Sequence, residues 1–314
     1  MINVVVTEKY LHEDTIEDFK KIENCNLHVV DNITDLDEET RNSIEVLLGA
    51  PTKETISLLP SLKMVQLFSA GANTFTWLDD SITLANAYGA YGKGIGEHML
   101  AVALMFQKNF PNYYAQQKER EWIRANNVMV MSNATVLSVG AGAIGTEFLR
   151  LCSLLGAHTI AIRRSIHDKK EFIDEMYTMN ELDSKLKEAD IVALSLPETS
   201  ETIHLFNEEK LRLMKKSAIL MNVGRGSAIV TNDLINVLKD GYFRGVSLDV
   251  TEPEPLPKNN PLWNFPNVQI TPHISGGFES IANYDNVISV VKENLVRYIH
   301  NEPLLHIIDK KLGY

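Results

Sequence analysis

Short apolar runs rich in β-branched residues alternate along the chain with longer stretches of helical period. In the N-terminal part, these runs predict strands at residues 3–7, 27–30, 45–48 and 64–68. A second series predicts strands at residues 135–139, 159–162, 191–194, 218–221, 245–248 and 268–271. Strands that alternate with helices form parallel sheets covered by helices on both faces. The pattern therefore predicts an α/β fold with two Rossmann-like domains, the second with a complete dinucleotide-binding sheet.

Two further stretches of helical period fall outside these series, at about residues 96–107 and 280–300. No strand follows the last helix, so we expect it to pack against the N-terminal unit. This arrangement predicts a discontinuous substrate-binding domain formed by residues 1–92 and 280–314. Residues 93–279 would form the dinucleotide-binding domain. Because the chain would cross twice between the two domains, we also expect a cleft between them.

Composition excludes several classes of partner. The chain has 314 residues with 30 basic and 41 acidic side chains, a net charge of -11. A nucleic-acid binder needs a concentrated basic surface, so we expect no nucleic-acid partner. Cys25 and Cys152 form no CxxC pair and lie near no histidine cluster, so we expect reduced thiols, no metal site and a cytoplasmic protein. Residues 1–6 predict a strand and no signal peptide, and no apolar run has membrane-spanning length, so we expect no membrane partner.

A glycine-rich turn follows the first strand of the second series. Residues 140–145 read Gly140-Ala141-Gly142-Ala143-Ile144-Gly145, with a strand before them and a helical stretch after them. In such a turn Gly140 permits the tight bend, Gly142 lets backbone amides approach a pyrophosphate, and Gly145 allows close packing of helix on strand. The helix N-terminus offers amides and a positive dipole end to the phosphates. Residues 140–145, with Ala143 and Ile144 included, are therefore predicted to bind a nicotinamide dinucleotide.

The end of the next strand indicates which dinucleotide is bound. Sites for NAD usually carry an acidic residue here, which accepts a hydrogen bond from the ribose 2′-hydroxyl. This chain has Arg163-Arg164-Ser165 instead, and the nearest acidic residue is Asp168. Arginine forms charge-assisted bonds with phosphate oxygens, which suits the 2′-phosphate of NADP(H). We therefore expect NADP(H) to be preferred, with NAD(H) also possible. A solvated basic pair with no ligand is the alternative interpretation.

Three later segments carry residues that a hydride-transfer site for a 2-keto acid would need. They are residues 222–226, 249–257 and 271–277, and each follows a predicted strand. Ligands of open α/β sheets bind beyond the carboxyl ends of the strands. These segments are therefore expected to meet at one edge of the second sheet.

Over nearly its whole length the sequence resembles the D-isomer-specific 2-hydroxyacid dehydrogenase family, and within it the glyoxylate/hydroxypyruvate reductases. The resemblance rests on several motifs in the correct order: Ser69-Ala70-Gly71-Ala72-Asn73, Gly96-Glu97-His98, Gly140 to Gly145, Leu196-Pro197-Glu198-Thr199, Asn222 to Gly226, Asp249 to Pro257, and Thr271 to Gly276. It implies an NAD(P)-dependent enzyme that interconverts a small 2-keto acid and the D-2-hydroxy acid. It also implies a homodimer, and Trp122 is equally consistent with a subunit interface or with core burial.

The resemblance also implies roles for individual residues. Arg225 would bind the substrate carboxylate and polarise the keto oxygen, and His273 would be the general acid in reduction. Glu254 would hold the imidazole and stabilise its cation. Glu252 lies two residues away, but the family spacing favours Glu254. The substrate carboxylate would also contact the backbone at Ala70, Gly71 and Ala72.

Further cofactor contacts are implied at the ends of the later strands: Leu196, Pro197, Val223, Gly224, Asp249, His273 and Gly276. Ala143 departs from the family pattern, in which arginine is frequent, so one phosphate contact would be missing. Two alternative functions stay open. One is an NAD(H)-dependent enzyme for another substrate, of the phosphoglycerate type, and the other is a non-enzymatic dinucleotide-sensing protein that resembles a corepressor.

Overall fold

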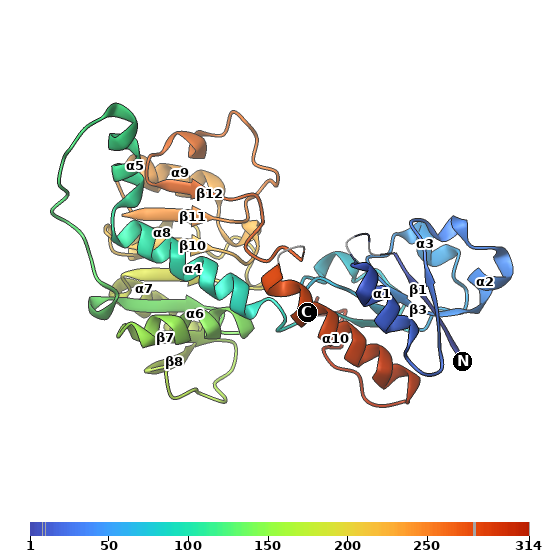
Figure 1. The fold of residues 1–314 in the computed structure, drawn as a ribbon. Helices are drawn as coiled ribbons and strands as arrows, with labels where there is room; N and C mark the ends of the chain where they lie inside the picture. The colour runs from blue at the N-terminus through green and yellow to red at the C-terminus, as the bar shows by residue number, and fades with distance from the viewer. Residues whose placement is uncertain (8, 10, 279–280, 314) are drawn as a thin grey trace. The chain divides into compact units, whose positions relative to one another are not determined.

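Two all-parallel sheets form the centres of two units of the chain (Figure 1). The structure is a computed structural model that describes residues 1–7, 9, 11–278 and 281–313. The N-terminal unit comprises Met1–Tyr91 and Gly277–Tyr314, and the central unit comprises Gly92–Gly276. The two parallel sheets confirm the predicted α/β fold. The cleft between the units stays a prediction.

The sheet of the N-terminal unit has five strands in the order β2-β1-β3-β4-β5. Its elements are β1 (Ile2–Val6), β2 (Cys25–Val29), β3 (Ile44–Leu48), β4 (Met64–Gln66) and β5 (Thr83–Ala85), with helices α1 (Glu13–Lys20), α2 (Glu38–Ser43), α3 (Lys53–Ser57) and α10 (Ile281–Ile299). The sequence did not predict β5, because three residues are too few to show a period of two. The last helix belongs to this unit. Its buried Asn294 amide donates to Gln66 Oε1 in β4 at 2.7 Å.

The central unit has seven strands in the order β12-β11-β10-β9-β6-β7-β8. The strands are β6 (Thr135–Val139), β7 (His158–Arg163), β8 (Glu175–Thr178), β9 (Ile191–Leu194), β10 (Ile219–Asn222), β11 (Gly245–Leu248) and β12 (Val268–Ile270). The helices are α4 (Gly92–Gln107), α5 (Phe110–Glu119), α6 (Ala143–Leu154), α7 (Leu182–Glu188), α8 (Glu208–Leu213) and α9 (Thr231–Lys239). The strand order reverses between β6 and β9, which creates the crevice where nucleotides bind in such sheets.

Two details of the central unit differ from the sequence prediction. Six strands were predicted, and β8 is the seventh; it is a half-buried edge strand that mixes polar and apolar residues, so it lacks the apolar run of a central strand. Helix α4 begins at Gly92 and not at residue 96. Its first turn contains Gly92 and Gly94, which weaken a helical pattern in the sequence.

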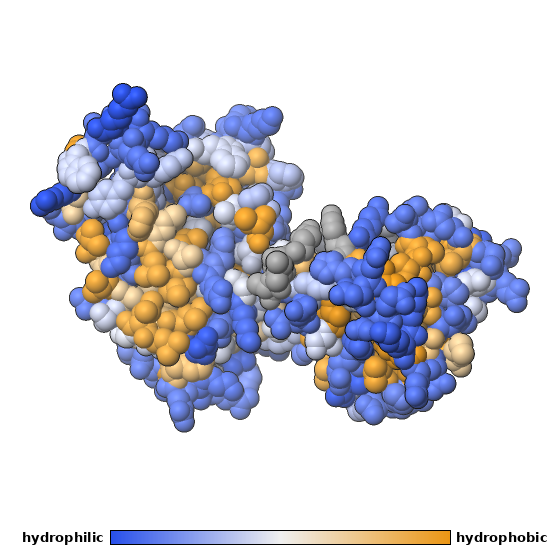
Figure 2. Space-filling view, in the orientation of Figure 1, coloured by the Kyte–Doolittle hydropathy of each residue, from blue (hydrophilic) through white to orange (hydrophobic). Residues whose placement is uncertain are grey.

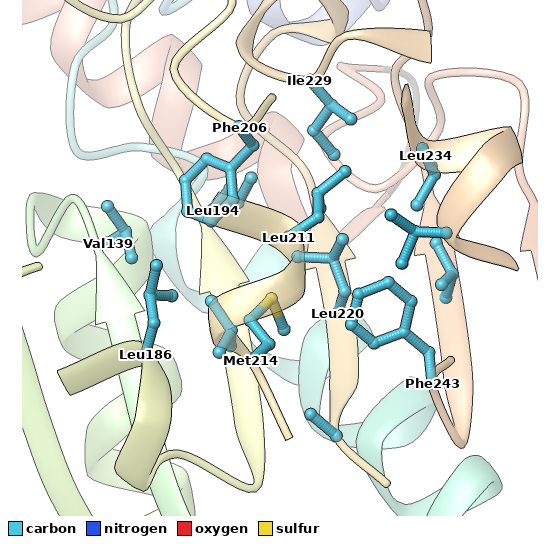
Figure 3. Close-up of a cluster of buried hydrophobic side chains, with 14 of the residues drawn as sticks. Val139, Leu186, Leu194, Phe206, Leu211, Met214, Leu220, Ile229, Leu234 and Phe243 are labelled. Carbon is cyan, nitrogen blue, oxygen red and sulfur yellow. The ribbon is translucent and has the colours of Figure 1, made fainter. Parts of the chain in front are cut away.

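The helices cover both faces of the seven-stranded sheet. On one face, α7, α8 and α9 close an apolar core against the strands (Figure 3). Its labelled members are Val139, Leu186, Leu194, Phe206, Leu211, Met214, Leu220, Ile229, Leu234 and Phe243. On the other face, α4 packs closely on α6, since a Cβ added at Gly96 would lie 2.8 Å from Glu147 Cγ. The sheet thus rests between two packed layers, which fixes the positions of its loops.

Candidate active site

The turn after β6 has the geometry that a pyrophosphate cradle needs. Gly140 has φ of 90°, a conformation that favours glycine. A Cβ added at Gly145 would lie 2.1 Å from the Gly140 carbonyl oxygen and 2.3 Å from Ser138 Oγ, so only glycine fits. Helix α6 begins directly after Gly142, which has no side chain to cap it. The first amides of a helix lack intrahelical acceptors, so this end can bind phosphate oxygens.

The loops after β9 and β10 lie against the same turn. A Cβ added at Gly140 would lie 2.7 Å from the Ser195 carbonyl oxygen, and one at Gly224 would lie 2.7 Å from the Leu196 amide nitrogen. Ser195 Oγ also donates to the Gly140 carbonyl at 2.5 Å. Three of the predicted cofactor segments therefore meet at the carboxyl edge of the sheet: residues 140–145, Leu196-Pro197 and Val223-Gly224. These residues fit a dinucleotide, because close backbone contacts at Gly140, Gly145 and Gly224 leave no room for side chains at these three positions.

The end of β7 carries a small polar cluster. Arg164 and Ser165 are exposed, and Arg163 is half-buried. The imidazole of His167 connects the cluster, with Nε2 3.2 Å from Arg163 Nη2 and Nδ1 3.1 Å from Ser165 Oγ. His167 was not among the predicted cofactor residues, although it lies only two residues after Ser165 in the sequence.

His273 and Glu254 form a hydrogen-bonded pair. His273 Nδ1 lies 2.7 Å from Glu254 Oε1, and both side chains are about half exposed. No hydrogen bond from Nε2 to another described residue is present. The backbone of His273 has φ of 53°, and its amide donates to the Asp249 carbonyl oxygen at 2.9 Å. The geometry thus fixes one ring nitrogen and leaves the other free for a substrate.

Asp249 organises the loop that carries His273. Its carboxylate accepts hydrogen bonds from Thr271 Oγ1 at 2.6 Å and from Ser275 Oγ at 2.5 Å. It also accepts from the backbone amides of Ile274 at 3.0 Å and Ser275 at 3.1 Å. Burial alone would raise the pKa of Asp249, but these hydrogen bonds outweigh it and hold the pKa below its ordinary value. A carboxylate offers about four acceptor positions, so Asp249 is fully engaged by this loop.

Arg225 lies on the loop that follows β10. The buried Asn222 side chain closes this loop, donating to the Arg225 carbonyl oxygen at 2.9 Å and accepting from the Gly224 amide at 3.1 Å. A Cβ added at Gly226 would lie 2.0 Å from the Thr251 carbonyl oxygen. Because Gly226 packs on Thr251, the loop of Arg225 adjoins the loop of Glu254. The structure thus brings the two loops into contact.

The structure also separates the two acidic residues that the sequence left as alternatives. Glu254 pairs with His273, whereas Glu252 Oε2 lies 3.0 Å from Nε2 of His204. His204 lies in none of the predicted site segments. Gly276 follows the His273 loop directly, at the end of the central unit.

The predicted substrate backbone lies in the N-terminal unit, in the loop after β4. Side chains hold its carbonyl groups: Asn86 Nδ2 donates to the Ala70 oxygen at 2.5 Å, and Ser69 Oγ donates to the Gly71 oxygen at 2.9 Å. No hydrogen bond from the Gly71 or Ala72 amide to another described residue is present. Ala72 is buried and Gly71 is partly buried. Buried amides are nearly always paired, so the Ala72 amide in particular suits an anionic ligand.

Other site classes find no support among the described residues. No group of three or more His, Cys, Asp or Glu side chains is arranged to hold a metal ion. Burial raises the pKa of Cys25 to about 11 and of Cys152 to about 12, so both thiols are protonated at neutral pH. Among the described helices, none combines the length and the hydrophobicity that a membrane span requires.

Comparison with known proteins gives a consistent result. Residues 100–275 match the model of the NAD-binding domain of D-isomer specific 2-hydroxyacid dehydrogenases. The chain is 28% identical over 270 residues to the glyoxylate reductase of Thermofilum pendens, covering 82% of this chain and 78% of that protein. It is 28% identical to a D-isomer specific 2-hydroxyacid dehydrogenase family protein from Aeromonas salmonicida, with a TM-score of 0.86 over 98% and 99% of the two chains.

A further solved structure has a similar fold. It is the NADPH-dependent glyoxylate/hydroxypyruvate reductase of Sinorhizobium meliloti in complex with NADP and sulfate. It is 24% identical to this chain, with a TM-score of 0.86 over 100% of both chains.

Proposed function

Because the chain belongs to the D-isomer-specific 2-hydroxyacid dehydrogenase family, we propose that it reduces a small 2-keto acid, such as glyoxylate or hydroxypyruvate, to the D-2-hydroxy acid with NADPH. The family makes it an NAD(P)-dependent oxidoreductase. The observation that carries the proposal is the His273–Glu254 pair, in which Nδ1 is hydrogen-bonded to Glu254 and Nε2 has no partner among the described residues. Such a pair is suited to transfer a proton to a substrate oxygen.

The bound dinucleotide supplies the hydride that is added to the keto carbon. His273 donates the proton from Nε2 to the keto oxygen, so that hydride and proton together give the hydroxyl group. The Glu254 carboxylate, 2.7 Å from Nδ1, orients the ring and stabilises its cationic form before transfer. Asp249 holds the backbone of this loop, so the imidazole is fixed before the substrate arrives.

The substrate carboxylate needs a separate binding site. The planar Arg225 guanidinium can bind it through two parallel hydrogen bonds, and its charge also polarises the keto oxygen. The Gly71 and Ala72 amides, which donate to no other described residue, supply further donors. Carboxylate binding orients the keto carbon for hydride transfer, and such positioning accounts for several kcal/mol of rate enhancement in enzymes.

The cluster at the end of β7 supports NADP(H) over NAD(H). No acidic residue stands at positions 163–165 to accept from a ribose 2′-hydroxyl. Arg163 and Ser165 are instead joined through His167, which gives a preorganised set of donors for a 2′-phosphate. The Sinorhizobium meliloti reductase, with its NADP complex, is in line with this assignment.

An apolar surface of the central unit supports a homodimer. Helix α4 is apolar on most sides, yet its Ala101 is exposed and its Leu104 is half-buried. Leu154 of the neighbouring α6 is 70% exposed, and orange side chains gather on this part of the unit in Figure 2. Trp122, in the segment after α5, is 93% exposed. Apolar patches of this kind mark interfaces between proteins.

Steady-state kinetics test the proposed function. We expect oxidation of NADPH with glyoxylate or hydroxypyruvate, and a kcat/KM for NADPH well above that for NADH. Arg225→Ala is expected to lower kcat/KM by at least about 10³-fold, because both carboxylate binding and keto polarisation are lost. Arg212→Ala, which removes two partly exposed ion pairs, with Glu208 and with Asp240, is the matched control and should leave kcat/KM unchanged. Unaltered turnover by the Arg225 variant would contradict the proposal.

A further inference from the structure

Two acidic residues of one loop each pair with a different imidazole. Glu254 pairs with His273 at 2.7 Å, and Glu252 pairs with His204 at 3.0 Å. The side chains of the second pair are 55% and 45% exposed, close to the 49% and 42% of the first. Burial therefore does not explain why Glu254 and not Glu252 pairs with His273.

Backbone hydrogen bonds hold the segment of His204 in place. Its φ of 55° lies in the left-handed region, which is unfavourable for a residue with a side chain. Its amide donates to the Ser227 carbonyl oxygen at 2.7 Å, and the Phe206 amide donates to the Ala228 oxygen at 2.9 Å. The segment of His204 is thus attached to the loop that begins with Arg225. Its imidazole has a defined place beside the proposed active site.

The main chain around Glu252 is fixed by other contacts. Thr231 Oγ1 donates to the Glu252 carbonyl oxygen at 2.7 Å, and Thr251 Oγ1 donates to the Pro253 oxygen at 2.9 Å. These bonds hold the backbone but not the Glu252 carboxylate. The contact of that carboxylate is with His204 Nε2. Without His204, the Glu252 side chain could turn while its backbone stayed in place.

We propose that His204 is a positioning residue that holds the Glu252 carboxylate away from His273, so that Glu254 is the carboxylate partner of the reactive imidazole. Glu252 and Glu254 are two residues apart, so their Cα atoms lie within about 7 Å. A released Glu252 carboxylate would compete with Glu254 for His273. Its negative charge would also favour the imidazolium form. The inference rests on the proposed function, in which His273 donates the proton.

The test compares His204→Ala, Glu252→Gln and the double variant. In reduction, kcat/KM falls at high pH as His273 loses its proton. In His204→Ala, this fall of kcat/KM at high pH (the alkaline limb of the profile) should occur at a pH about half a unit higher, as expected for one added charge near an exposed group. It should also lower kcat severalfold and leave KM for NADPH within about twofold, because the cofactor loops are untouched. In Glu252→Gln and in the double variant, kcat/KM should fall at the same pH as in the wild type, since neither protein carries a negative charge at position 252.

Two further variants separate positioning from general loosening of the loop. His204→Gln retains a donor for Glu252 and should restore the wild-type profile. His204→Asn is too short to reach Glu252 and should behave like His204→Ala. An unmoved limb in His204→Ala and His204→Asn would overturn the proposal. So would an equal shift in the double variant, because the shift would then not come from Glu252.

An NMR titration of the His273 ring in the cofactor-free protein gives the same comparison without turnover. The titration curve of His273 should move to higher pH in His204→Ala and stay in place in the double variant. This readout distinguishes the two proposals: absence of keto-acid reduction by the wild type would contradict the proposed function alone. An unmoved His273 titration in His204→Ala would contradict the positioning role alone.

Discussion

Replacing Asp249 with asparagine tests how the loop of His273 is held. The wild-type carboxylate accepts hydrogen bonds from two hydroxyl groups and two backbone amides. Asparagine turns one acceptor oxygen into an NH2 group that faces one of these amides, so about two of the four bonds are lost. A hydrogen bond to a charged group contributes about 1.5–3 kcal/mol, and a buried donor left unpaired costs about 1–3 kcal/mol. We expect the free energy of unfolding of the central unit to fall by about 2–5 kcal/mol.

The pH dependence of this loss follows from the direction of the pKa shift. The pKa of folded Asp249 lies below its ordinary value, and the unfolded value is about 3.9. Asp249 therefore stabilises the folded state fully at neutral pH. That contribution disappears as the pH falls below about 4 and through the lower pKa of the folded state. Urea unfolding of wild type and Asp249→Asn should differ at pH 7, and the difference should shrink below pH 4.

Activity gives the second readout for Asp249. A displacement of His273 by about 1 Å costs about 10²-fold in rate, so kcat should fall by about 10–100-fold. The matched control is Asp174→Asn, whose carboxylate also accepts from the Thr159 amide at 2.7 Å but lies on a loop before β8. The control should lose stability and keep kcat. If Asp249→Asn weakened cofactor binding with no loss of stability, Asp249 would act on the nicotinamide and not on the loop.

Three further predictions follow from single contacts. Gly226→Ala should lower kcat at least about tenfold in steady-state assays, because its Cβ would lie 2.0 Å from the Thr251 carbonyl oxygen and push the loop of Arg225 away from the loop of Glu254. A kcat equal to that of the wild type would contradict the contact between these loops. The double variant Arg163→Ala, Arg164→Ala should raise KM for NADPH at least about tenfold and leave KM for NADH within about twofold; equal effects on both cofactors would rule out a 2′-phosphate site. Light scattering after size exclusion should give the mass of two chains for wild type and of one chain for Trp122→Ser, since Trp122 is 93% exposed in the single chain; a single-chain mass for the wild type would contradict the homodimer.

Hydrophobic periodicity was sufficient to predict the two parallel sheets, because most strands are buried on both faces and are continuous apolar runs. It failed for β5 and β8, which are short edge strands with too few apolar residues to show a period. The family resemblance, carried by several motifs in order, is confirmed by the match over residues 100–275. The boundaries of the domains and the roles of the site residues stay predictions.

The contacts that distinguish similar residues could not be predicted from the sequence. Glu252 and Glu254 have nearly the same sequence surroundings, and only the position of His204, about fifty residues earlier, separates them. Likewise the sequence places Asp249 at the end of a strand, but it does not show that the Asp249 carboxylate accepts hydrogen bonds from the His273 loop. Such pairings depend on loop conformations after separate strands. Neither the hydrophobic period of the sequence nor the spacing of its motifs indicates which side chains these loops bring together.

In the proposed function, Nε2 of His273 transfers the proton in the reduction of a 2-keto acid. His273→Gln keeps a polar side chain that can still pair with Glu254, so fold and cofactor binding should be retained. The direct test is the rate of NADPH oxidation by this variant with glyoxylate or hydroxypyruvate, with NADPH affinity measured by calorimetry on the same sample. We predict a loss of kcat of at least about 10²-fold with NADPH affinity within about twofold of wild type. Wild-type turnover by a variant that binds NADPH normally would contradict the claim.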